Sequence, residues 1–121
     1  MAGIPKGWVP GRREVIWIDF DPQAGKEMSK EHPLLVLSTA AFNERTGLVI
    51  GLPMTHAEWT ETNPFALRFS GPKKEACYVL THQPKSMDWR ARKARPHPLK
   101  LVPAHVFADA LESLNDIISL A

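Results

Sequence analysis

Hydrophobic residues along the chain fall in short runs separated by Gly, Pro, Asn and charged clusters, at intervals of roughly ten to fifteen residues. The runs are rich in β-branched and aromatic residues, and each is too short for a good helix. They are Val15–Phe20, Leu34–Ser38, Leu48–Leu52, Phe65–Phe69, Cys77–Thr81 and a weaker Leu99–Val102. The pattern predicts a mainly β protein, folded as a compact antiparallel barrel or a strongly curved sheet.

The end of the chain has a different period. Phe107, Leu111, Leu114 and Ile118 repeat at three- and four-residue spacing, and Pro103 stands just before them, where a helix tolerates proline. This spacing predicts a C-terminal amphipathic helix. We expect its apolar stripe to close one end of the barrel.

Several apolar and aromatic residues are expected to fill the barrel. Trp89 is expected in the core or at a dimer interface, because buried tryptophan usually serves packing. Asn43 is expected to make a hydrogen bond that fixes a loop. The expected core residues are Trp17, Phe20, Val36, Leu37, Val49, Tyr78 and Val79.

Composition bounds the class of protein. With 121 residues, 44% of them apolar, the chain fits one globular domain spanning 1–121. No apolar run reaches the roughly 18 residues that cross a bilayer, and the N-terminus lacks the apolar core of a signal peptide. Cys77 is the sole cysteine, so a disulfide within the chain is excluded and a cytoplasmic location is the simplest interpretation.

Charge is unevenly distributed although the net charge is only +2. Basic residues are concentrated between Lys85 and Lys100, whereas the charged residues after Ala104 are acidic. Such a segment suits a polyanion or an acidic partner, but a solvated basic loop has the same composition.

Familiar catalytic motifs are absent. The histidines lack zinc-ligand spacing, and the chain has no nucleotide-binding glycine loop or serine-hydrolase elbow. What remains is a set of polar residues where strands are expected to end, and loops at one end of a small barrel converge. These residues are Glu27, Lys30, Glu31 and His32, then Thr55 and His56, then His82, Gln83, Lys85 and Ser86.

An acid/base group, a hydroxyl and a cation together suit cleavage of an RNA phosphodiester without a metal ion or other cofactor. Taken alone, however, histidines and a threonine at strand ends are usually ordinary surface residues. Two segments, 21–33 and 56–64, are long polar links of the kind that often carry function. Trp59 lies in the second, where its ring could stack on a base or cover the barrel.

Successive sequence blocks resemble the PemK/MazF toxin family in their usual order: VIWIDFDPQAGKE, HPLLVLSTAAFN, GLVIGLPMT, NPFALRF and VLTHQPKSMDWRARKA. The most specific are WIDFDP and QPKSMDWRAR. The resemblance implies an SH3-like β-barrel assembled as a homodimer. It also implies a metal-independent endoribonuclease that cuts single-stranded RNA, leaves a 2′,3′-cyclic phosphate and a 5′-hydroxyl, and is neutralised by an acidic, partly disordered antitoxin.

The resemblance also assigns site residues. Thr55 matches the family's active-site threonine and Glu27 its loop carboxylate, whereas His32 stands where the family has arginine. Histidine cannot make the permanent bidentate phosphate contact of arginine. Either His32 transfers a proton, with His56, His82 or Lys30 as the second group, or the site binds without cleaving. The remaining RNA-binding assignments are Trp59, Gln83, Lys85, Ser86 and Arg90.

Two other functions remain open. Gyrase poisons of the CcdB type resemble the family in fold but bind a protein target through a helix that typically ends in Trp-Gly-Ile. This chain ends with the residues 117–121, IISLA, and lacks that ending. A plain SH3-like module that binds RNA or protein without catalysis is the third possibility.

Overall fold

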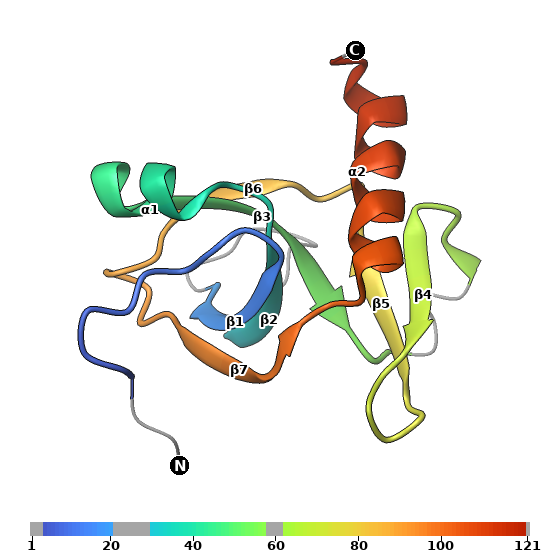
Figure 1. The fold of residues 1–121 in the computed structure, drawn as a ribbon. Coiled ribbons are helices and arrows are strands. Elements are labelled where there is room, and N and C mark those ends of the chain that lie inside the picture. The colour runs from blue at the N-terminus through green and yellow to red at the C-terminus, as the bar shows by residue number, and fades with distance from the viewer. Residues whose placement is uncertain (1–3, 21–29, 58–61, 121) are drawn as a thin grey trace.

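The computed structural model describes residues 4–20, 30–57 and 62–120, and these form seven strands and two helices (Figure 1). The elements in chain order are β1 (Glu14–Asp19), β2 (Glu31–Val36), α1 (Ala40–Thr46), β3 (Leu48–Thr55), β4 (Ala66–Ser70), β5 (Ala76–Leu80), β6 (Lys85–Asp88), β7 (Arg95–Leu101) and α2 (Ala104–Ile118).

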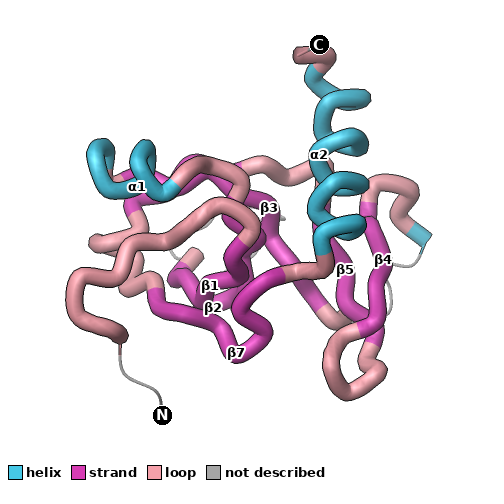
Figure 2. Tube along the Cα trace, viewed as in Figure 1, coloured by secondary structure: helices cyan, strands magenta, loops and turns pink. Residues whose placement is uncertain are grey.

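All the strand pairs are antiparallel, and the sheet has the order β4-β5-β3-β2-β1-β7. β3 is the strand on which the sheet bends. One edge of β3 pairs with β2, while its other edge pairs first with β6 through Leu48–Gly51 and then with β5 through Met54 and Thr55. The hairpin of β4 and β5 therefore turns away from β1, β2 and β7, as Figure 2 shows.

Side chains alternate across the sheet and build two cores. The helix-side core contains Val15, Leu35, Leu52, Met54, Cys77 and Val79, and the buried face of α2 packs into it through Val106, Ala110 and Leu114. The second core lies on the opposite face and contains Ile16, Ile18, Phe20, Leu34, Val36, Val49, Met87 and Trp89. Successive residues of one strand consequently serve different compartments, as a period of two requires.

The short helix α1 is held by specific polar contacts. The Thr39 hydroxyl caps its N-terminus by accepting from the Phe42 amide at 3.3 Å, and Gly47 ends it with φ 74°. Asn43 is fully buried and donates to the Pro10 carbonyl at 2.7 Å, while the Trp89 indole donates to the Asn43 carbonyl at 2.8 Å. The prediction that Asn43 makes a hydrogen bond that fixes a loop is therefore confirmed, because Pro10 belongs to the loop before β1; Asn43 itself lies on α1.

The mainly β, SH3-like fold with a C-terminal helix is confirmed. β2 and β7 begin earlier than predicted, and α1 and β6 were not predicted. Trp17 was wrongly placed in the core: it is half-buried on the face opposite Ile16 and Ile18, beside the His97 ring at 4.6 Å. Trp89 is buried in the second core. Within the described residues, none of the helices is long and apolar enough to span a membrane.

Candidate active site

The pairing of β2 with β3 brings two predicted site residues to the same face. Leu34 pairs with Pro53, and Val36 pairs with Gly51. Leu34–Pro53 is the last pair that joins the two strands at this end, and His32 and Thr55 each lie two residues beyond it on their own strands. Their side chains share the face of Leu34 and Val36, at the open end of the second core. We call this surface the His32–Thr55 face.

His32 is supported by β1. It pairs with Ile18, is half-buried, and lies edge-on to the Phe20 ring with 5.7 Å between ring centroids. The Phe20 amide donates to the Lys30 carbonyl at 2.8 Å, which holds the two strands together at the point where the preceding loop begins. Lys30 itself is exposed and has φ 63°. Glu27 lies outside the described residues.

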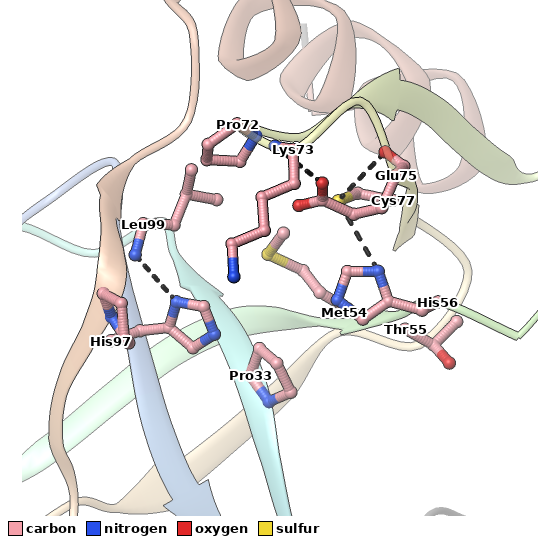
Figure 3. A pocket seen from close by; sticks show the side chains of 11 residues that line it. Pro33, Met54, Thr55, His56, Pro72, Lys73, Glu75, Cys77, His97 and Leu99 are labelled. Carbon is pink, nitrogen blue, oxygen red and sulfur yellow. Dashed lines mark hydrogen bonds between the residues drawn. The ribbon is translucent and has the colours of Figure 1, made fainter.

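Thr55 is the last residue of β3. Its Oγ1 accepts from the Ala57 amide at 3.1 Å, a contact that turns the chain at the end of the strand. On the other edge of β3 its partner is Tyr78. Figure 3 shows the Thr55 side chain pointing away from Met54 and His56, as alternation along a strand requires. Trp59 lies outside the described residues.

His82 belongs to a polar group just after β5. The Phe65 amide donates to Asn63 Oδ1 at 2.9 Å, so the Asn63 Nδ2 group is the one that faces His82 Nε2 at 3.3 Å. Gln83 Nε2 lies 3.2 Å from the same ring nitrogen. His82 Nε2 therefore accepts, and the ring proton is on Nδ1. Nδ1 is buried and has no partner among the described residues.

His56 lies on the opposite side of the sheet from Thr55. Its Nδ1 donates to the Ala76 carbonyl at 3.0 Å, and Cys77 Sγ is 3.7 Å from the same nitrogen. Its ring projects into a pocket at the lower end of the helix-side core (Figure 3). The structure therefore separates His56 from the His32–Thr55 face.

Three further predicted residues lie along β6 and just beyond it. Lys85 pairs with Gly51, and Ser86 pairs with Ile50. Ile50 lies five residues before Thr55 on β3, so the two are about 17 Å apart along an extended strand. Arg90 is farther still: its guanidinium lies 4.4 Å from the Trp89 ring and 3.5 Å from the Glu44 carbonyl of α1. The structure does not bring Ser86 and Arg90 next to Thr55.

Asn63, Phe65 and His97 were not singled out from the sequence, although they lie beside predicted residues. Asn63 and Phe65 belong to the NPFALRF block, which could have indicated them. His97 lies between two prolines in a segment interpreted as a basic loop, and nothing in that pattern distinguishes it. Burial, followed by the nearby charges of His56 and Arg95, lowers the pKa of His97 below its usual value.

Metal binding has no support in the part of the chain that the structure describes, because no three His, Cys, Asp or Glu side chains there gather as a ligand set. The sole cysteine is buried. Burial and the adjacent Glu75 carboxylate raise the pKa of the Cys77 thiol. A thiol in that state is a poor nucleophile.

The curved antiparallel sheet defines a small β-barrel protein that carries an imidazole and a hydroxyl at the ends of β2 and β3. A family model described as "PemK-like, MazF-like toxin of type II toxin-antitoxin system" matches residues 11–118. The endoribonuclease toxin MazF of Escherichia coli K12 is 34% identical over 105 residues, which cover 82% of this chain and 92% of that protein.

Solved structures agree with the sequence matches. The crystal structure of MazF from Deinococcus radiodurans has a TM-score of 0.83 and 34% identity, covering 93% of this chain and 99% of that one. A MazE–MazF complex from the same organism gives a TM-score of 0.78 at 33% identity, covering 94% of this chain and 99% of that one. The chain belongs to the PemK/MazF family of type II toxin–antitoxin toxins.

Proposed function

We propose that this chain is the toxin of a type II toxin–antitoxin system and acts as an endoribonuclease on single-stranded RNA. One structural observation carries the proposal. His32 and Thr55, which by resemblance correspond to the family's arginine and threonine, each lie two residues beyond the last β2–β3 pair, Leu34–Pro53, and this supports the proposal. The relatives named as endoribonucleases support the same activity.

The chemistry follows from what the two side chains can do. His32 accepts the proton of the RNA 2′-hydroxyl as that oxygen attacks the phosphorus, and the bond from phosphorus to the 5′-oxygen breaks. Thr55 donates a hydrogen bond to a non-bridging phosphate oxygen, where negative charge develops. The departing 5′-oxygen takes a proton from a second group, for which His82 and Lys30 are the candidates. The products are a 2′,3′-cyclic phosphate and a 5′-hydroxyl, and no cofactor takes part.

RNA contacts extend to the polar group after β5. The buried Nδ1–H of His82 has no partner among the described residues, and leaving a buried donor unpaired costs about 1–3 kcal/mol. Phe65 is 45% exposed, and its ring centroid is 5.9 Å from that of His82, so it offers a surface for a base. Gln83 belongs to this surface. Glu27 is proposed by resemblance as the catalytic carboxylate, and Trp59 is proposed as a ring that stacks on a base; both lie outside the described residues.

The same proposal includes a partner, an assembly and a compartment. The partner is a cognate antitoxin with an acidic, partly disordered arm, in keeping with the MazE–MazF complex of the Deinococcus relative. The assembly is a homodimer, supported by the exposed apolar side chains Ile117, Ile118 and Leu120 at the end of α2. One domain over 1–121, in the cytoplasm where its RNA substrate is found, completes the proposal.

A cleavage assay tests this function. Purified protein is incubated with a long single-stranded RNA, with and without EDTA, beside Thr55→Ala, His32→Ala and the control His105→Ala, a surface histidine of α2. We expect EDTA-resistant cleavage with cyclic-phosphate ends, reduced at least a hundredfold in the first two variants, which is the lower end of what one acid/base group contributes. Unchanged cleavage in both variants would show that the active centre lies elsewhere.

The second candidate is a family member that binds RNA or its partner without cutting. The observation that favours it is the imidazole at position 32, which lacks the forked donor set of a guanidinium. A folded wild-type dimer that binds RNA but leaves it intact, and that gains cleavage on His32→Arg substitution, would establish this second function.

A further inference from the structure

A second site lies on the face of the sheet opposite Thr55. It is a pocket of about 370 Å³ below α2, between β7, the end of β3 and the turn that joins β4 to β5 (Figure 3). Its apolar wall consists of Pro33, Met54, Pro72, Cys77, Pro98 and Leu99. A cavity of this size, mostly apolar with a few polar groups, is typical of small-molecule sites. Thr55 also lines the pocket, although its side chain points away from those of Met54 and His56. The mechanism proposed above uses none of the other lining side chains.

Two imidazole rings project into this pocket, and their hydrogen bonds fix opposite tautomers. His56 Nδ1 is 3.0 Å from the Ala76 carbonyl, which can only accept, so in the neutral ring Nδ1 carries the proton and Nε2 is an acceptor. His97 Nδ1 instead accepts from the Leu99 amide at 3.0 Å, so its proton is on Nε2, a donor. Burial, which lowers the pKa of His97, favours this neutral form. The pocket therefore presents one donor and one acceptor.

The charges at the mouth of the pocket are one lysine and one carboxylate. Lys73 lines it and is exposed, and Figure 3 shows its side chain extending between His97 and Met54. Glu75 also lines it, with Oε2 accepting from the Lys73 amide at 2.8 Å in the hairpin turn. Lys73 is therefore the cation of this lining that can contact a phosphate group, whereas Glu75 accepts a hydrogen bond within the turn.

We propose that this pocket binds one nucleotide unit, with its base between the two imidazoles and its phosphate at Lys73. Every nucleobase has adjacent donor and acceptor atoms on its pairing edge, matching the His97 donor and the His56 acceptor. The flat apolar ring fits against Met54, Pro33 and Leu99. The source is either a free nucleoside monophosphate or a nucleotide of an RNA strand, since both present the same base and phosphate.

The surface beside the pocket would accommodate the neighbouring nucleotide of a strand. The Trp17 ring lies next to the His97 ring, with 4.6 Å between their centroids, and the Arg95 guanidinium lies 5.4 Å from the Trp17 ring. An aromatic ring with an arginine over it is a common platform for stacked bases and their phosphates. Arg95 also pairs with Glu31, which holds it in place.

Binding is measured by calorimetry with each of the four nucleoside monophosphates, and separately with a 2′-O-methyl hexanucleotide that cannot be cleaved. His56→Phe and His97→Phe keep a flat ring and remove one hydrogen-bonding edge each. Lys73→Gln removes the cation, and Lys74→Gln is the matched control, a neighbouring exposed lysine of the same turn that does not line the pocket. We expect His56→Phe, His97→Phe and Lys73→Gln each to bind about tenfold more weakly than wild type. Lys74→Gln should bind as tightly as wild type.

A direct observation guards against variants that fold poorly. In the wild-type protein, ¹⁵N chemical shifts of the imidazole nitrogens report whether His56 Nε2 and His97 Nε2 change on adding the ligand. Shifts with a mononucleotide identify the free source, and shifts with the hexanucleotide alone identify the RNA source. No shift with either, or binding that ignores all three substitutions, would overturn the proposal. His32→Ala, a variant expected to lose cleavage at a residue that does not line the pocket, should still bind the ligand here, so binding is tested separately from cleavage.

Discussion

At the scale of the residue, the proposed role of His32 in proton transfer gives a prediction about the side chain at position 32. Histidine changes its charge between about pH 5 and 8, whereas arginine stays charged throughout. If His32 transfers the proton, His32→Arg should flatten the dependence of the cleavage rate on pH across that interval. Initial rates from pH 5 to 9, with His105→Arg as the control, check this. Identical profiles for wild type and His32→Arg would exclude His32 as the titrating group.

The buried thiol gives a prediction about reactivity and stability. Burial and Glu75 raise the pKa of Cys77, so native protein should react with iodoacetamide at pH 8 at least about tenfold more slowly than protein in urea. Because the folded state holds the proton more tightly than the unfolded state, this contribution to the unfolding free energy is complete below the unfolded thiol's pKa. It is lost as the pH rises through the folded value.

The Glu75→Gln variant provides the control for that prediction. It removes the second cause of the raised pKa but leaves the thiol buried, so alkylation of the native protein should become faster. If native and unfolded protein react at the same rate, the thiol is accessible and its pKa is not raised.

At the scale of the element, the close approach of β2 to β3 depends on Gly51. A Cβ added there would lie 2.5 Å from the Leu35 carbonyl oxygen and 2.8 Å from the Leu34 side chain. Backbone cannot give way as a side-chain end can, so Gly51→Ala should cost about 1–3 kcal/mol or more in unfolding free energy. Because it would also shift the strands that carry His32 and Thr55, cleavage should fall with it.

Urea denaturation of Gly51→Ala beside Gly11→Ala measures the effect. A Cβ on Gly11 meets only the carboxylate end of Glu14, at 3.3 Å, and that side chain can move away. The Gly11 variant should therefore lie close to wild type. Equal losses in the two variants would contradict the role given to Gly51.

The elements also show where sequence reasoning succeeds and where it stops. The runs around Val15, Leu34 and Leu48 were recognised because β-branched and apolar residues fill both faces of these strands. β6 has one buried residue, Met87, in four positions, which is too little for a pattern. α1 has seven residues, too few to be stable alone, and depends on the contact of Asn43 with Trp89, far along the chain.

The candidate site was predicted less completely than the fold. Chain order identified Thr55, His32 and His82, but it also grouped His56 with Thr55 as its neighbour. Side-chain alternation sends these adjacent residues to opposite faces of the sheet. This could be predicted only if the residue at which β3 ends were known. His97 enters the pocket through the pairing of β7 with β1, and that pairing joins residues roughly eighty positions apart.

At the scale of the whole molecule, the outer end of α2 projects beyond the sheet in Figure 1 and exposes Ile117 and Ile118, at 41% and 44%. If these side chains lie in the proposed homodimer interface, Ile118→Asp should weaken dimerisation at least about tenfold, because a buried unpaired charge is costly. Light scattering over a concentration series measures this, with Ile4→Asp as the control on an exposed isoleucine at the N-terminal end. Equal dissociation of both variants, or of neither, would place the interface elsewhere.

The alternation of side chains at the end of β3 has a mechanical consequence for the two faces of the sheet. Met54 and His56 face the pocket below α2, whereas Thr55 between them faces the other compartment. Consecutive Cα atoms are about 3.8 Å apart and joined by planar peptide units. A rotation of the strand that tightens the grip of His56 on anything in the pocket must therefore tilt the Thr55 hydroxyl in the opposite sense. A movement of the end of β3 therefore changes the positions of the His56 and Thr55 side chains together.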